Sequence, residues 1–193
     1  MVLSKGIQGA NVYIVLLHHP VLNKAGDTIA SAVTPLDLHD ISRAGRTYGV
    51  RRFFVVTPLT DQKELVQQVI DHWITGYGAT FNPSRREALK LIALADTLEV
   101  AKECIRADGH GEPTVVVTSS RAHSTGTSYQ TLRQMLGDGR PYLLVFGTAW
   151  GLTPEVIENA DICLKPIRGG ANDYNHLSVR SAATAVLDRL LGY

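Results

Sequence analysis

The stretch PIRGGANDYNHLSVRSAATAVLDRLLGY, residues 166–193, places two glycines and a run of polar residues directly before an amphipathic segment. Ala183, Val186 and Leu190 recur at helical spacing, which predicts a closing helix, expected from Tyr174 to Tyr193. Ordering a glycine-containing loop costs conformational entropy, so the loop before this helix is expected to bind a ligand.

Upstream of this stretch, short apolar runs rich in β-branched or aromatic residues alternate with amphipathic segments. The runs predict buried strands at residues 11–17, 50–58, 114–120, 142–147 and 161–166. Because strands and helices alternate, the chain is expected to form one Rossmann-like α/β domain over residues 1–193. Its sheet is expected to be mostly parallel, with helices on both faces.

Helix starts lie between these strands. Thr34-Pro35 and Thr153-Pro154 each put a capping residue before a proline at the first helical position. Ser84 and Glu87 have the spacing of a capping box, and apolar residues then recur at helical spacing to about Asp108. We therefore expect one long helix over that segment.

The composition limits the functional classes. The 193 residues carry 19 basic and 18 acidic side chains, so a site for a polyanion must be a local patch. The two cysteines, Cys104 and Cys163, form no disulfide framework, and the histidines and cysteines lack zinc-ligand spacing. The apolar run at residues 11–17 is too short to cross a bilayer. We expect a cytoplasmic protein with no membrane span and no metal.

Ligands of such sheets bind outside the carboxyl ends of the strands. Small or polar residues follow four of the predicted strands, at His18-His19-Pro20 and at residues 118–121, 147–152 and 165–170. The chain contains no G-x-x-x-x-G-K-[ST] motif, and its G-x-G pairs follow predicted helices. The apolar neighbours of these turns suit an adenine and a sugar better than a triphosphate.

The residues GTAWGLTPEVIENADICLKPIRGGANDYNHLSVRSAATAVLDRLL, 147–191, resemble the C-terminal motif block of the SPOUT class of RNA methyltransferases. Within them, YNHLSVRSAA resembles one uncharacterised bacterial SPOUT family particularly closely. The resemblance is strong over residues 114–193 and weaker over 11–57, and it does not extend to 61–110. It implies a deep C-terminal trefoil knot, a bent S-adenosylmethionine in the motif loops, and a homodimer.

The same resemblance implies that the turns after the strands hold the cofactor. Gly147, Gly151 and Gly169 are expected to allow close approach of the backbone, and residues 169–173 to order over the bound cofactor. The cofactor-binding residues that we predict are Thr118, Ser119, Ser120, Phe146, Gly147, Thr148, Gly151, Leu152, Pro166, Ile167, Arg168, Gly169, Asn175, His176, Leu177, Ser178 and Val179.

The catalytic residues are less well indicated. Arg43 resembles the arginine of the first family motif, and Asp37, His39 and Asp40 on the same predicted helix are candidate bases. Ribose-methylating members of the class have the motif S-L-N-V-S. At the corresponding place this chain has HLSVR, residues 176–180, and this difference does not favour ribose as the methyl acceptor. The arginine pairs 51–52 and 85–86 are interpreted as solvated surface residues, with a phosphate-contacting patch as the alternative.

Two classes of function follow from the resemblance. The first is methyl transfer from S-adenosylmethionine to a nucleotide of tRNA or rRNA. The second is a regulatory or RNA-binding module that binds S-adenosylmethionine without catalysis, indicated by the replaced motif residues. A flavodoxin-like nucleotide protein is a third hypothesis, which requires a bound flavin or mononucleotide.

Overall fold

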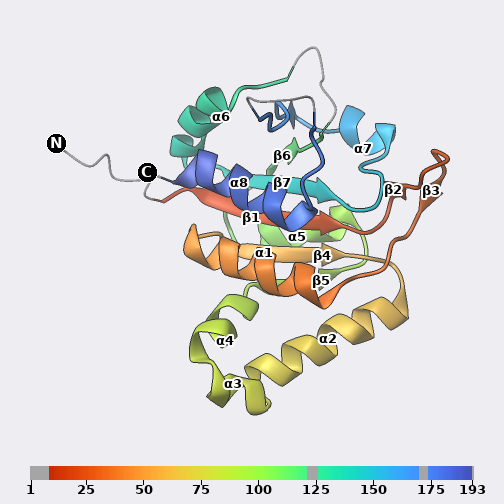
Figure 1. Ribbon diagram of the computed structural model, residues 1–193. Helices are drawn as coiled ribbons and strands as arrows, with labels where there is room; N and C mark the ends of the chain where they lie inside the picture. Colours follow the sequence, from red (N-terminus) through yellow and green to blue (C-terminus); the bar gives the residue numbers. More distant parts are fainter. Residues whose placement is uncertain (1–8, 121–125, 170–173, 193) are drawn as a thin grey trace.

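A six-stranded parallel sheet forms the centre of the molecule (Figure 1). The computed structural model describes residues 9–120, 126–169 and 174–192. The strand order is β5-β4-β1-β7-β6-β8, and every pairing in this sheet is parallel. The strands are β1 (Asn11–Leu17), β4 (Arg52–Val56), β5 (Ile92–Ala95), β6 (Thr114–Val117), β7 (Pro141–Gly147) and β8 (Ile162–Cys163).

Helices cover both faces of the sheet, as the sequence predicts. On one face α1 (Pro35–Thr47), α6 (Tyr129–Met135) and α8 (Val179–Leu191) bury apolar residues against β1, β4 and β7. On the other face α5 (Leu98–Ala107) packs through Ala101 and Ile105, with α7 (Pro154–Glu158) beside it. The central strands β1 and β7 are buried almost throughout, because both of their faces are covered.

Residues 60–89 form a helical arm that lies to one side of the sheet (Figure 1). The arm consists of α2 (Thr60–Ile74), α3 (Tyr77–Phe81) and α4 (Pro83–Leu89). Val66, Ala88 and Leu89 join the arm to the core beneath α1.

The long helix predicted from Ser84 to Asp108 is wrong. That segment forms α4, the edge strand β5 and α5. Asn82, not Ser84, caps α4, since its side chain accepts a hydrogen bond from the Arg85 N–H at 3.0 Å. The apolar residues of β5 coincide with helical spacing, but β5 pairs with β4 and so completes the sheet.

The closing helix also begins later than predicted. Ser178 caps it and accepts a hydrogen bond from the Ser181 N–H, so α8 starts at Val179 and residues 174–178 run as non-helical backbone. Tyr193 and residues 170–173 lie outside the described residues.

Two short strands absent from the sequence prediction, β2 (Val21–Leu22) and β3 (Thr28–Ile29), form a hairpin after β1. Val21 pairs with Leu152 in an isolated bridge, which brings the hairpin to the turn that follows β7. Through the described parts of the chain, no helix has the length and apolar character to span a bilayer. The same residues include no group of three histidine, cysteine or acidic side chains that could hold a metal.

Candidate active site

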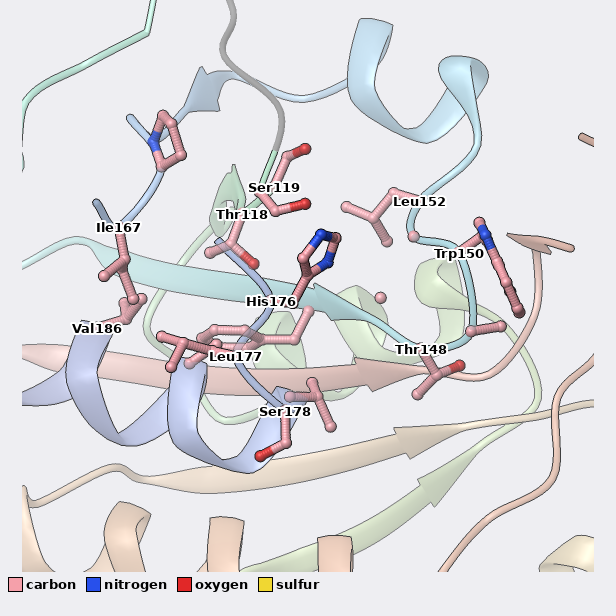
Figure 2. A pocket seen from close by; sticks show the side chains of 18 of the residues that line it. Thr118, Ser119, Thr148, Trp150, Leu152, Ile167, His176, Leu177, Ser178 and Val186 are labelled. Atoms are coloured by element: carbon pink, nitrogen blue, oxygen red, sulfur yellow. The ribbon is translucent and has the colours of Figure 1, made fainter. Parts of the chain in front are cut away.

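A cavity of about 980 Å³ opens at the carboxyl ends of the central strands (Figure 2). The turns after β6, β7 and β8 meet there, and the chain from Asn175 to Val179 forms a further wall. Figure 2 shows His176 between Ile167 and Val186 on one side and Leu152 and Trp150 on the other. Every predicted cofactor residue lines this cavity except Arg168 and Gly169.

The turn after β7 is held by its own backbone. The Gly151 N–H donates to the Thr148 carbonyl at 2.9 Å, and the Trp150 N–H donates to the Leu22 carbonyl of the hairpin at 3.0 Å. A Cβ on Gly147 would lie 2.8 Å from the backbone nitrogen of Leu152, a separation that forces the turn to move. Gly151 has a φ of +104°, in the left-handed region that favours glycine.

The surroundings of the three predicted glycines differ. Gly147 is required because the turn closes on Leu152, and a Cβ on Gly151 or Gly169 would meet no atom within 4 Å. Gly169 lies outside the cavity lining, and its expected close approach to a ligand stays a prediction. The expected closing segment continues through residues 170–173, and Arg121 follows β6; both lie outside the described residues.

The turn after β8 leaves its backbone groups available. Residues 166–169 form no hydrogen bond with any other residue that the structure describes, although Pro166 and Ile167 are half-buried and line the cavity. Buried backbone groups nearly always have partners, so these N–H and carbonyl groups are suited to a ligand. The wall opposite is fixed where the Asn175 side chain donates to the Ser120 carbonyl at 2.9 Å.

A chain of hydrogen bonds lies beneath the cavity. Nδ1 of the fully buried His18 is 3.0 Å from the Ser31 hydroxyl, which is 2.5 Å from the Thr148 hydroxyl. Thr148 also donates to the Leu17 carbonyl at 3.0 Å, and the Ser31 hydroxyl donates to the His18 carbonyl at 3.5 Å. Burial lowers the pKa of His18 from 6.5 to about 4, so its ring is neutral at neutral pH.

One buried carboxylate faces the cavity. Asp37, in the first turn of α1, is 6% exposed and lines the cavity wall. Its Oδ1 accepts from Nη1 of Arg180 at 2.8 Å, and Nε of Arg180 is 3.3 Å from Oδ2 of Asp40. The first turns of α1 and α8 are therefore joined at the cavity by one guanidinium between two carboxylates.

The other predicted catalytic residues do not line the cavity. Arg43 is exposed on α1, one to two turns beyond Asp37, and Asp40 is reached only through Arg180. His39 packs edge-on against Trp73 of the arm, with ring centroids 5.3 Å apart. Burial, followed by the charge of Arg85, lowers the pKa of His39. The structure thus brings Asp37 alone of the four to the cavity.

The sequence interpretation omitted several wall residues. Ser31, Ala32 and Thr34 reach the cavity from the hairpin connection, for which the sequence gives no signal. Arg180 stood in the quoted HLSVR motif, but its partner Asp37 is 143 positions away along the chain. Of the other wall residues, Ala149, Trp150 and Lys165 lie in turns that the sequence indicated, whereas Tyr129, Ile157, Ala182 and Val186 were omitted.

Comparison with known proteins identifies the family. A model of the family described as SAM-dependent RNA methyltransferase matches residues 11–192. The chain belongs to this family. The predicted RNA methyltransferase class and its cofactor, S-adenosylmethionine, are thereby confirmed at the level of the family.

Individual relatives agree with this assignment. A tRNA (guanine-N(1)-)-methyltransferase of Oleidesulfovibrio alaskensis is 42% identical over 95% of this chain, and this chain spans 43% of that relative's length. An uncharacterised protein of Aquifex aeolicus is 39% identical over 93% of this chain and 88% of its own length. A probable methylase family protein of Haemophilus influenzae shares the fold, with a TM-score of 0.61 and 19% identity over 93% of this chain and 64% of its own.

The cavity residues fit S-adenosylmethionine. The volume is in the usual range for a small-molecule site, and the walls combine apolar side chains with a few polar groups. Ile167, Leu152 and Val179 would offer apolar surface to an adenine, and the backbone groups of Pro166 and Ile167, which bond to no other described residue, would offer polar groups to its edge. Asp37 and Lys165 add charged groups of both signs for the amino-acid part of the cofactor or for the acceptor.

Proposed function

We propose that this chain transfers the methyl group of S-adenosylmethionine to a nucleotide of RNA at the carboxyl edge of its sheet. The observation that carries the proposal is the position of Asp37: a buried carboxylate lines the same cavity as the turns at residues 147–152 and 166–167. A cofactor site and a group able to accept a proton therefore share one space.

The cofactor-holding residues are those of the cavity wall. Thr118, Ser119, Phe146, Leu152 and Ile167 are among them, and of the predicted cofactor residues only Arg168 and Gly169 lie outside the lining. When bound, S-adenosylmethionine supplies an electrophilic methyl group on a sulfonium. The protein's contribution is to align the acceptor with that methyl group, to exclude water and to remove the acceptor's proton.

Asp37 is the residue that we assign to the acceptor. Arg180 fixes the carboxylate through Oδ1 and is itself fixed by Asp40, so the orientation of Asp37 is determined before RNA arrives. Asp37 would accept a hydrogen bond, and then the proton, from the N–H or O–H of the acceptor nucleotide. Arg43, predicted as catalytic from its motif, is proposed instead to contact RNA outside the cavity.

The proposed substrate class is tRNA, as the name of the O. alaskensis relative indicates for that protein. Since this chain spans less than half of that relative, we do not transfer the guanine-N1 position to it. For the methylated atom we propose only its kind: a nitrogen or oxygen that carries a proton, because a carboxylate in the site suits such an acceptor. We also propose the cytoplasm as its location, in keeping with two free cysteines.

We further propose a homodimer that closes the mouth of the cavity. Trp150 and Leu177, which line the cavity, are 55% and 51% exposed. Leu36 and Tyr174, which are close in sequence to residues of the cavity wall, are 61% and 72% exposed. The two exposed apolar residues of the cavity lining, Trp150 and Leu177, support a contact surface at its mouth. The outer face of α8 contributes little to it, because Val186, Leu187 and Leu190 are buried within the chain.

The C-terminal trefoil knot is likewise a proposal. It is supported by the course of the chain, since β8 pairs with β6 at the sheet edge while α8 returns to pack on α1 and α6. Residues 174–178 lie against the turn after β6 on the way, through the contact of Asn175 with Ser120. Pulling the chain from both ends in a single-molecule experiment should give an unfolded contour length shorter than that of an unknotted chain.

The activity is tested by incubating the purified chain with tritiated S-adenosylmethionine and bulk bacterial tRNA or rRNA. We expect label in one RNA class, together with calorimetric binding of S-adenosylmethionine and S-adenosylhomocysteine but not of ATP or NAD. Tight binding of S-adenosylmethionine without transfer to any RNA would contradict the enzyme and support a non-catalytic binding module.

A further inference from the structure

Four arginines gather on the face shared by α1 and the arm. Arg43 and Arg46 lie on α1, and Arg85 and Arg86 lie on α4, which packs against α1. Arg43, Arg46 and Arg86 are exposed, and none of the four forms an ion pair with a carboxylate among the described residues. We call these residues the arginine face.

Several cations elsewhere in the described part of the chain are paired with carboxylates. On α5, Lys102 and Arg106 pair with Glu99 and Glu112, and Lys63 at the start of the arm pairs with Asp96 at 2.7 Å. Within α3 and α4 the single carboxylate, Glu87, is bound to Lys90 at 2.6 Å. The arginine face therefore has a local excess of positive charge on a chain whose net charge is only +1.

Two exposed aromatic rings lie next to this face in the arm. Tyr77 and Phe81 on α3 are 74% and 72% exposed, and their rings stack at 6.0 Å between centroids with an interplanar angle of 26°. The hydrophobic core does not include them. Arg85 packs on another ring of the arm, since its guanidinium lies 4.7 Å from the ring centroid of Trp73 on α2, and Trp73 also contacts His39 of α1.

We propose that the arginine face and the Tyr77–Phe81 pair bind the RNA substrate outside the cavity. This inference rests on the proposed function and adds a docking site to it. Arginine guanidinium groups bind phosphate oxygens bidentately, and exposed aromatic rings stack with unpaired bases whatever their sequence. Positive charge with interleaved aromatic rings is the pattern of a single-stranded nucleic-acid surface.

The position of the face fits a strand that also enters the cavity. Asp37 at the start of α1 lines the cavity, and Arg43 follows six residues later, about 9 Å along the helix axis. His39, Arg43 and Arg46 have the spacing of one helical stripe, which faces the arm. An RNA strand whose target nucleotide lies beside Asp37 can therefore continue along α1 to α4.

The test compares tRNA binding by wild type and two double variants over a series of salt concentrations. Arg46→Glu/Arg86→Glu reverses two exposed charges, and Tyr77→Ser/Phe81→Ser removes both rings. We expect the charge variant to bind bulk bacterial tRNA at least about tenfold more weakly and to lose about one unit of salt dependence for each arginine. The aromatic variant should bind more weakly with an unchanged salt dependence.

Two controls define the comparison. Arg51→Glu reverses an exposed arginine near Tyr13, whose ring packs on the α5 side of the sheet, and should leave tRNA affinity nearly unchanged. Calorimetry with S-adenosylmethionine and thermal unfolding should give wild-type values for both double variants, because their residues lie outside the cavity.

The inference is overturned if the charge variant binds tRNA with wild-type affinity and salt dependence. It is also overturned if the variant binds anionic lipid vesicles more weakly than wild type does but binds tRNA equally well. The two proposals can fail separately. Wild-type methyl transfer by a variant with unchanged tRNA binding removes the docking face alone. If the variants lose tRNA binding and the wild type transfers no methyl group, the proposed activity is wrong and the docking face stands.

Discussion

The cavity edge and the helical arm use their polar and apolar groups in opposite ways. At the cavity edge, the turns after the strands point backbone groups and half-buried side chains into one concave space. The arm contributes no residue to that space, and it presents exposed rings and arginines. A concave site suits a small cofactor, whereas exposed cationic and aromatic groups suit a long polymer.

The difference also explains why the cofactor and the RNA can bind independently. Core residues connect the arm to α1, but the arm contributes no residue to the cavity wall. Changes at the turns should therefore alter cofactor affinity without altering the arm. Changes in the arm should alter stability or RNA affinity without altering the cofactor site.

The largest effect is expected at the turn after β7. In Gly147→Val, the new Cβ would lie 2.8 Å from the backbone nitrogen of Leu152. Because this distance is too short, the turn must move. Calorimetry should show binding of S-adenosylmethionine weakened by at least about 10²-fold, with circular dichroism close to wild type. Gly137→Val is the matched control and should bind normally, since Gly137 lies outside the cavity lining and its Cβ would meet nothing within 4 Å. Normal binding by a folded Gly147→Val variant would show that this turn does not hold the cofactor.

The next effect separates chemistry from cofactor binding. Asp37→Asn keeps the shape of the side chain but removes the proton acceptor at the cavity wall. We expect single-turnover methyl transfer to fall by about 10²-fold or more while affinity for S-adenosylmethionine is nearly unchanged. Asp40→Asn, at a carboxylate that is 46% exposed and outside the cavity lining, should have a smaller effect on the rate. Equal rates of methyl transfer for Asp37→Asn and wild type would show that a group other than Asp37 accepts the proton.

The hydrogen bonds beneath the cavity predict a pH dependence of stability. The folded state holds the pKa of His18 at about 4, below its unfolded value near 6.5, so the folded state binds fewer protons between these pH values. The free energy of unfolding should therefore fall as the pH drops from 6.5 toward 4, by roughly 3 kcal/mol at most. Urea unfolding of His18→Asn should show a shallower decline over that range, and identical pH slopes for the two proteins would contradict the assignment.

The two tryptophans give the smallest effect and the most direct contrast between the regions. Trp73 is half-buried in the arm, under Arg85 and beside His39, whereas Trp150 is 55% exposed at the cavity. Trp73→Ala should lower the free energy of unfolding by about 2 kcal/mol and leave cofactor affinity unchanged. Trp150→Ala should cost less than about 1 kcal/mol in stability and weaken cofactor binding several-fold. The reverse pattern would mean that the two regions are coupled.

Much of the cavity edge could be predicted from the sequence because its signals are local. A buried strand followed by small residues, as in Phe146-Gly147, predicts where backbone groups end at a sheet edge. The arm and β5 could not be predicted in the same way. Ile92–Ala95 is apolar at positions that also fit a helix, and only pairing with β4 decides between the two structures.

The candidate catalytic group shows the other limit of the sequence. Asp37, His39, Asp40 and Arg43 all lie on α1, and nothing local indicates which of them faces the cavity. The decision depends on α8, whose Arg180 binds Asp37 across 143 positions of the chain. A contact between residues so far apart in the sequence forms only once the sheet and its covering helices have folded. The periodicity of neither segment indicates it.

Hydrogen exchange with and without S-adenosylmethionine tests the central claim most directly. If the cavity holds the cofactor, saturating S-adenosylmethionine should protect the backbone amides of residues 147–152, 167–169 and 175–179, and leave residues 60–89 of the arm unchanged. Protection confined to the arm, or no change in the turns at a concentration where calorimetry reports saturation, would contradict the account.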